Sequence, residues 1–166
     1  TPEDRDIIGN PFPKYSYSFN LGASWKNFDL STFWQGVGGI YRYSWETSTD
    51  IRGNLTSRWV NRYSDDNINA PMPALGNTMN DSYSSFWLEN SSYLRLKNFT
   101  VSYDLSDVIR KCAHLQERNS MMSVYLSGEN LFTITNYSGM DPETGGWDAL
   151  KYPVSRIFSV GVKLTY

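Results

Sequence analysis

The stretch YSYSFNLGASWK, residues 15–26, decides the fold class of this chain, because large apolar residues alternate with polar or small ones from its first position to its last. Successive side chains of a β-strand point to opposite faces, so the pattern predicts a strand with one apolar and one polar face. The predicted strand is longer than most strands of soluble sandwiches. It fits a strand that crosses a bilayer, for which about 9 to 11 tilted residues suffice.

Four later stretches repeat the alternation, and together they predict an all-β chain of antiparallel strands. Only Lys26 and Asn27 separate the first strand from the second, which predicts a two-residue turn. In the third strand the segment before Asn98 has the opposite phase, which indicates either a β-bulge near Asn98 or a projection beyond the membrane. The predicted strands span residues 15–26, 28–38, 93–105, 121–132 and 157–166.

The connections between these strands alternate between short and long. Residues 40–90 and 133–155 have no sustained period and are rich in residues that favour turns. Loops of this length are normal on the extracellular side of an outer-membrane barrel and uncommon inside a compact soluble domain. We therefore predict two extracellular loops. Residues 106–119 are expected to form a periplasmic connection, which Ser106 could open as the cap of a helical turn.

The last predicted strand ends on an aromatic residue, as expected for the final strand of a bacterial outer-membrane barrel, whereas the termini of soluble domains tend to fray. Its apolar face consists of Phe158, Val160, Val162, Leu164 and Tyr166. If this face meets lipid, Val160→Arg should destabilise the protein by about 2–4 kcal/mol. Gly161→Ser, on the lumen face, should have a much smaller effect.

Composition argues against several classes of function. Lys and Arg total 15 against 17 Asp and Glu, so nothing indicates binding to nucleic acid. Cys112 is the sole cysteine, and neither Cys112 nor His114 has the neighbours of a zinc site, so we expect no metal or cofactor. No apolar run approaches the roughly 18 residues of a membrane helix. The 16% of aromatic residues fits barrel girdles or a carbohydrate-binding surface.

Several blocks stand in a distinctive order along the chain. They are DIIGNP at 6–11, FDLS at 28–31 with FWQG at 33–36, SYLRLKN at 92–98, YLSGENLFT at 125–133, YSGMDPE at 137–143, and the ending after YP at 152–153. The ordered set resembles the C-terminal third of SusC/RagA-type TonB-dependent outer-membrane transporters. The resemblance implies a 22-stranded barrel around an N-terminal plug that is absent from this chain. It also implies TonB-energised import of glycan oligosaccharides, or of peptides in some members, with a SusD-like lipoprotein as lid.

Aromatic residues of the two loops are the candidates for contact with such a cargo, because flat rings stack on the apolar faces of sugars. The candidates are Trp45, Trp59, Tyr63, Trp87 and Trp147. Packing within the loops or contact with the lid competes with ligand binding for each, since large aromatic side chains are mostly buried. Asp141, Glu143 and Asp148 invite a calcium site, but their spacing matches no recognised loop and favours a solvated turn.

Enzymatic activity is not expected. No motif supports nucleophilic catalysis with His114, and the sequence does not pair two carboxylates across a cleft as a glycosidase requires. The acidic residues of the strands, Asp29, Asp104 and Glu129, are expected to face the lumen. The remaining alternative is a soluble β-sandwich module that binds carbohydrate, which would share the strands and the aromatic residues. Strand length and the uninterrupted apolar faces favour the barrel.

Overall fold

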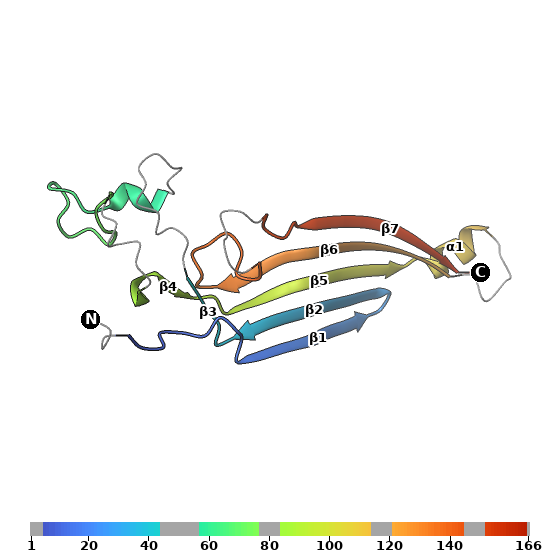
Figure 1. Cartoon of the computed structure of the whole chain (residues 1–166). Coiled ribbons are helices and arrows are strands. Elements are labelled where there is room, and N and C mark those ends of the chain that lie inside the picture. Colours follow the sequence, from blue (N-terminus) through green and yellow to red (C-terminus); the bar gives the residue numbers. More distant parts are fainter. Residues whose placement is uncertain (1–4, 44–56, 77–83, 114–120, 145–151, 166) are drawn as a thin grey trace.

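The main feature of the computed structural model is an antiparallel sheet of five strands in the order β1-β2-β5-β6-β7 (Figure 1). The model describes residues 5–43, 57–76, 84–113, 121–144 and 152–165. The strands are β1 (Tyr15–Trp25), β2 (Phe28–Gly38), β5 (Tyr93–Asp104), β6 (Met121–Thr135) and β7 (Ile157–Thr165). Each overlaps one of the ranges predicted from the alternation, and each pairs with its neighbour in chain order among these five. The all-β, antiparallel prediction is confirmed.

The strand register sorts the side chains of the sheet into an apolar face and a polar face. One apolar row runs across all five strands through Ala23, Leu30, Val101, Leu126 and Val160. The row beside it, on the other face, consists of Gly22, Ser31, Thr100, Ser127 and Ser159. Because cross-strand partners share a face, the alternation within each strand becomes a continuous property of the sheet.

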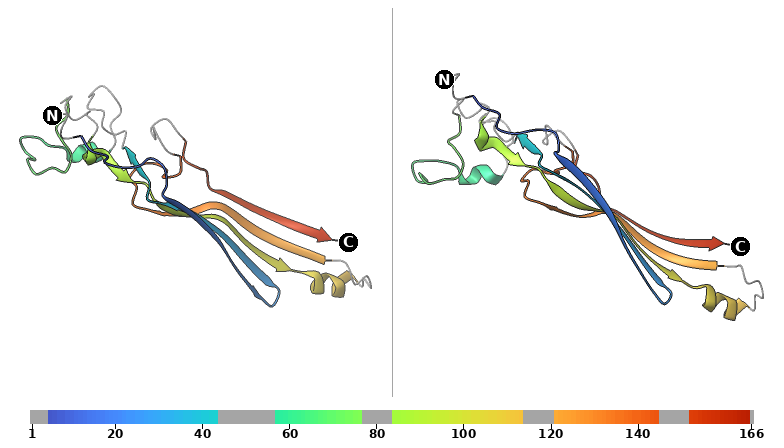
Figure 2. Two further views of the ribbon diagram at one scale, coloured as in Figure 1. Left: turned by 60° about the horizontal axis from the view of Figure 1, so that its bottom comes forward. Right: turned by 90° about the horizontal axis from the view of Figure 1, so that it is seen from below.

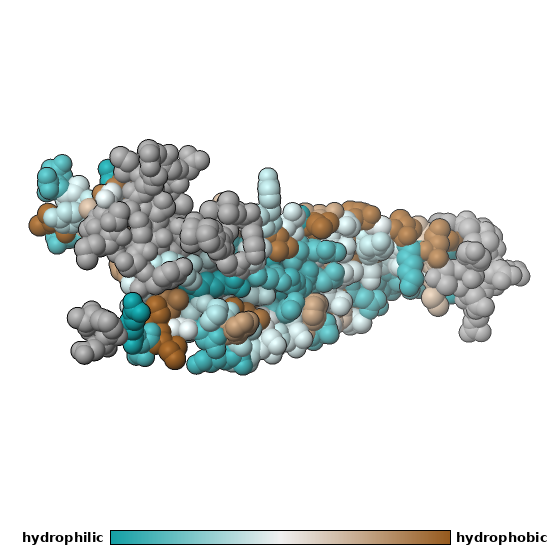
Figure 3. All heavy atoms as spheres, in the orientation of Figure 1, coloured by the Kyte–Doolittle hydropathy of each residue, from teal (hydrophilic) through white to brown (hydrophobic). Residues whose placement is uncertain are grey.

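The five-stranded sheet is a single twisted layer (Figure 2). Its apolar side chains are exposed, Leu126 to 49% and Val160 to 82%. The face seen in Figure 3 is hydrophilic along the middle of the strands. Soluble proteins rarely leave an apolar surface of this extent uncovered. Within the described residues the other sheet is the short pair β3 (Tyr41–Tyr43) and β4 (Leu88–Asn90), so the second layer that a β-sandwich requires is not seen there.

A two-residue turn at Lys26 and Asn27 joins β1 to β2, as predicted. Lys26 has a φ of 55°, the left-handed conformation that tight hairpin turns demand. The turn places Trp25 opposite Phe28, whose ring lies 4.6 Å from that of Tyr103. An aromatic cluster therefore closes this end of the apolar face.

The phase change in β5 is a β-bulge. The register of β5 shifts between Leu96 and Asn98 in its pairing with β6, and the pairing with β2 shifts at the same place. Lys97 has no partner in either pairing, and Asn130 and Leu131 of β6, which lie opposite it, are unpaired with β5. The shift returns Leu96 to the apolar face, opposite Trp34 and Phe132. Of the two explanations that the sequence allowed, the bulge is the one observed.

The connection after β5 begins with α1 (Ser106–Ala113). The Ser106 hydroxyl donates to Asp104 and accepts a hydrogen bond from the backbone N–H of Met122, at 3.0 Å. Ser106 therefore ties the start of the helix to β6, and the carbonyl of Leu105, rather than Ser106 as expected from the sequence, accepts the first helical hydrogen bond, from the N–H of Ile109. No helix in the described part of the chain is long and apolar enough to span a membrane.

The predicted loop at 40–90 contains regular structure in its described part. Besides β3 and β4 it forms two 3₁₀ turns, at Ser57–Asn61 and Ser85–Trp87. Elements of three to five residues are too short to show a period in the sequence. All of them lie at the end of the sheet opposite the β1–β2 turn and α1 (Figure 1).

Candidate functional site

The candidate site is the end of the sheet where both long connections gather (Figure 1). Of the aromatic residues proposed from the sequence as ligand contacts, the structure describes Trp59, Tyr63 and Trp87. Trp45 and Trp147 lie outside the described residues, as do Asp148, His114 and Tyr166. The three described aromatics differ sharply in burial, which separates packing residues from surface residues.

Trp59 and Trp87 form the core of the loop region. Their exposed fractions are 2% and 3%, and they cluster with Met72. The two indole rings lie 6.2 Å apart, and Phe86 packs edge-on against Trp87 at 4.8 Å. Neither indole has a free face for a sugar, so in this structure both tryptophans serve packing, the competing role considered for them.

Tyr63 is the exposed aromatic of the three, with 45% of its surface accessible. Its backbone N–H donates to the carbonyl of Met72 at 2.8 Å, which anchors it to the loop core. A turn closed by Asn67 and Ser64 follows directly, with the Asn67 N–H donating to the Ser64 carbonyl at 2.9 Å. Tyr63 therefore presents a ring from a backbone that is held in place, as a ligand-stacking residue requires.

Four charged side chains fasten the connection after β6 to the polar face of β5. Arg95 lies 2.7 Å from Asp141 and 2.6 Å from Glu143, and Lys97 lies 2.7 Å from Glu143. The side chains of Arg95 and Asp141 are each only 4% exposed. The solvated turn expected for residues 141–143 is therefore wrong. Its carboxylates form ion pairs with Arg95 and Lys97 of β5. The sequence of the turn alone does not reveal these basic partners.

Hydrogen bonds keep Asp141 ionised. Burial raises the pKa of Asp141, but the guanidinium of Arg95 and the backbone N–H groups of Glu143 and Val154 donate to its carboxylate and hold the pKa below its ordinary value. Charge-assisted hydrogen bonds of this kind are roughly twice as strong as neutral ones. The Asp141 carboxylate is therefore ionised at neutral pH.

A second polar contact joins the two long connections to each other. Glu89 of β4 accepts from the backbone N–H of Ser138 at 3.0 Å and forms an ion pair with Arg58 at 3.0 Å. Burial raises the pKa of Glu89, and the bonds from Ser138 and Arg58 outweigh it, so the net pKa is lowered. The hydroxyl of Ser91, a residue without exposed surface, donates to the Pro142 carbonyl at 3.1 Å.

Arg95, Glu89 and Ser91 were not among the residues singled out from the sequence. The sequence does carry a signal for Arg95. Continuing the alternation of the third predicted strand back from Phe99 puts this charged residue at a position where an apolar one is expected. Its partner Asp141 stands 46 positions away in a segment without periodicity. Sequence spacing gives no means of joining the two.

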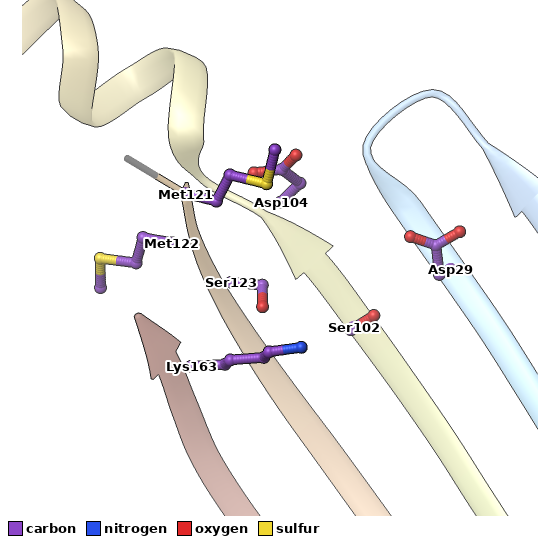
Figure 4. Close-up of a pocket in the computed structure, with 7 residues that line it drawn as sticks. All are labelled: Asp29, Ser102, Asp104, Met121, Met122, Ser123 and Lys163. Carbon is purple, nitrogen blue, oxygen red and sulfur yellow. The ribbon is translucent and has the colours of Figure 1, made fainter. Parts of the chain in front are cut away.

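The opposite end of the sheet carries a shallow polar pocket (Figure 4). Asp29 and Asp104 border it, and the side chain of Lys163 reaches across β6 toward Ser123. Asp29 and Asp104 thus lie on the polar face, as predicted for the acidic residues of the strands. The residues lining the pocket are Asp29, Ser102, Asp104, Met121, Met122, Ser123 and Lys163.

The last strand presents its apolar residues as expected. Phe158, Val160, Val162 and Leu164 are between 56% and 82% exposed. They continue the apolar face of β6 through the pairs Leu126–Val160 and Val124–Val162. This strand therefore contributes surface rather than core.

Comparison with known proteins finds relatives of this chain, although no protein-family model matches it. TonB-dependent receptor P3 of Formosa agariphila is 33% identical over 98% of the chain, and TonB-dependent receptor SusC of Bacteroides thetaiotaomicron is 27% identical over 93%. The chain spans only 17% and 14% of these two relatives.

Solved structures of the RagAB system have the same fold. The RagAB peptide importer in its open-open state aligns with 96% of the chain at a TM-score of 0.76 and 29% identity. The RagAB peptide transporter aligns with 95% at a TM-score of 0.77 and 30% identity. Each match covers 18% of the longer chain. The chain is thus homologous to the TonB-dependent receptors of the SusC and RagA type, corresponds to their C-terminal part, and belongs to an antiparallel transmembrane β-barrel of the bacterial outer membrane.

Proposed function

We propose that this chain supplies part of the wall and of the extracellular mouth of a nutrient importer that takes up glycan oligosaccharides or peptides. The observation that carries the proposal is the single-layer sheet, which has an exposed apolar face on one side and a polar face on the other. Lipid covers the first face and water fills the space beside the second. The relatives are receptors and transporters, which fits a role other than catalysis.

The chain spans less than a fifth of the length of its relatives, and the whole importer is proposed to have further parts. In the proposal a plug domain fills the barrel, TonB supplies energy through that part of the protein, and a SusD-like lipoprotein covers the mouth. Support for a covering partner comes from RagAB, whose structures include open-open and closed-closed states. The end of the sheet that carries the two long connections is the extracellular one, because the short turn and α1 occupy the other end.

Cargo contact is assigned to Tyr63 among the described aromatic residues. Its ring is exposed, and the neighbouring Arg62, Asp65 and Asp66 supply polar groups for hydroxyl or amide recognition. The peptide alternative is supported by the similarity to RagAB, a peptide importer, and the glycan alternative by the resemblance of the sequence to SusC-type transporters.

The first test is isolation of the native polypeptide from outer membranes in detergent, with its intact mass and its co-purifying proteins identified. The proposal expects a polypeptide much longer than 166 residues that travels with a lipoprotein. A free, water-soluble 19.1 kDa species would overturn it and favour the carbohydrate-binding module.

The second test addresses cargo in the intact complex. Binding of labelled oligosaccharide and peptide mixtures is measured for the native receptor, for Tyr63→Ala and for Tyr63→Phe. Loss of binding in Tyr63→Ala with retention in Tyr63→Phe supports ring stacking, and the mixture that binds identifies the cargo class. Equal binding by all three proteins rejects Tyr63 as a contact.

A further inference from the structure

The charged cluster of Arg95, Lys97, Asp141 and Glu143 has a geometry that exceeds what a surface ion pair needs. Arg95 uses each arm of its guanidinium group, with Nη2 donating to Asp141 at 2.7 Å, Nη1 to Glu143 at 2.6 Å and Nε to the Thr133 hydroxyl at 2.8 Å. Buried charges are costly unless they are hydrogen-bonded. Here the hydrogen bonds join Arg95 of β5 to residues of β6 and of the connection after it, which lie far from Arg95 in the sequence.

The β-bulge places two neighbouring cations on the polar face of the sheet. Arg95 and Lys97 stand two positions apart and share a face of a strand, and an unshifted register would put both on the apolar face with Phe99. The ammonium of Lys97 lies 2.7 Å from both carboxylate oxygens of Glu143, which Arg95 also contacts. The bulge therefore moves this positive charge to the face where Glu143 can bind it.

The cluster also reaches the first long connection, between β2 and β5, through the backbone of Pro142. Pro142, between the two acidic residues, accepts from Ser91, and Ser91 accepts from the side chain of Arg42 at 2.8 Å. Ser138, a few residues earlier, is held by Glu89. Both connections are thus bonded to each other as well as to the strand between them.

We propose that Arg95, Lys97, Asp141 and Glu143 form an ionic latch that pins residues 137–144 to the polar face of β5 and makes the described parts of the two long connections move as one body. If the chain forms the wall and mouth of an importer, as proposed above, the latch fixes part of the mouth to the wall. Opening and closing then belong to the lid or to both connections together, and not to residues 137–144 alone.

The latch is testable by distance measurement between two spin labels in the full-length receptor. Val60 and Met140 are suitable label sites, one in each connection, because they are 81% and 69% exposed. All other cysteines, Cys112 included, are first replaced. The latched receptor is expected to give one narrow distance distribution, and Arg95→Gln is expected to lose the narrow peak.

A matched control breaks an ion pair elsewhere. Arg110 binds Asp107 at 2.6 Å on α1, where both side chains are at least 37% exposed, and Arg110→Gln should leave the distribution unchanged. If Arg95→Gln does not fold, Lys97→Gln and Glu143→Gln decide, because their side chains are 20% and 27% exposed and tolerate the loss better. Narrow distributions in all folded variants of the cluster would overturn the latch.

The readout separates this inference from the proposed function. The distances need neither cargo nor TonB, so a receptor that binds no glycan or peptide can still show the latch. A receptor that imports normally while its two connections move independently disproves the latch and leaves the importer intact.

Discussion

Tyr125 and Gly161 face each other across β6 and β7, and the ring of the tyrosine fills the space that a side chain at position 161 would need. A Cβ built on Gly161 would collide with the outer end of the Tyr125 ring. Gly161→Ser therefore tests displacement of this ring as well as the lumen face, which makes it a less direct control than the sequence suggests. A serine there has to displace the ring, whatever surrounds that face.

The apolar face is better tested with one substitution placed on two adjacent residues. Val160→Arg puts a charge on the face assigned to lipid and should destabilise the receptor by about 2–4 kcal/mol. Ser159→Arg puts the same side chain on the polar face, opposite Ser127, and should have little effect. Urea unfolding of the full-length receptor in lipid vesicles measures both. Equal losses would show that the faces are assigned wrongly.

The loop core should depend on its two buried tryptophans. Trp59→Ala or Trp87→Ala removes a side chain with at most 3% exposure, a change that typically costs about 3–5 kcal/mol. Faster proteolysis of residues 57–90 in the intact receptor is the expected result, with the barrel still folded. Tyr63→Ala serves as the control and should leave proteolysis unchanged. Reduced cargo binding in Trp59→Ala without faster cleavage would instead favour direct contact.

The bulge opposite Lys97 should be sensitive to backbone conformation at Asn130. This residue has a φ of 53°, and its side-chain amide donates to the Ser155 carbonyl at 3.2 Å. Asn130→Val forces a β-branched residue into the left-handed region, which costs on the order of 1–3 kcal/mol. Asn130→Gly keeps the conformation and loses only the hydrogen bond, so the smaller loss is expected. The measurement is the unfolding midpoint of each protein. The midpoint should be highest for the parent protein, lower for Asn130→Gly and lowest for Asn130→Val.

The ionic cluster should withstand mild acid. The pKa of Asp141 is lowered in the folded protein, so its contribution to stability is complete above the ordinary pKa of 3.8 and is lost as the pH falls through the folded value. The groups facing it are Arg95, Glu143 and, through Glu143, Lys97. The label distances are therefore expected to stay constant from about pH 7 to about pH 5. A change near neutral pH would contradict this assignment.

The alternation predicted most of the wall because period two is a local property that pairing then repeats. The five strand ranges and the turn at Lys26 follow from neighbours in sequence, as does the change of phase near Asn98, whereas the choice between a bulge and a projection required the structure. The loop end was less predictable because its contacts join residues that are distant in sequence. Arg95 with Asp141 and Glu89 with Ser138 join residues 46 and 49 positions apart, and the burial of Trp59 depends on Met72 and Trp87. Composition suggested aromatic ligand contacts there, but only packing distinguishes Trp59 from Tyr63.

The pairing of Val37 with Tyr93 brings together two strands that a long connection separates. The entropy lost on closing such a connection grows only with the logarithm of its length, about 0.6 kcal/mol for each doubling. Insertions between Gly38 and Tyr93 therefore hardly affect assembly of the sheet, whereas one inserted residue inside β2 or β5 turns the following side chains to the opposite face. Changes of length in this connection are therefore compatible with an unchanged sheet, whereas a change of length inside a strand must be absorbed locally, as the bulge at Lys97 does.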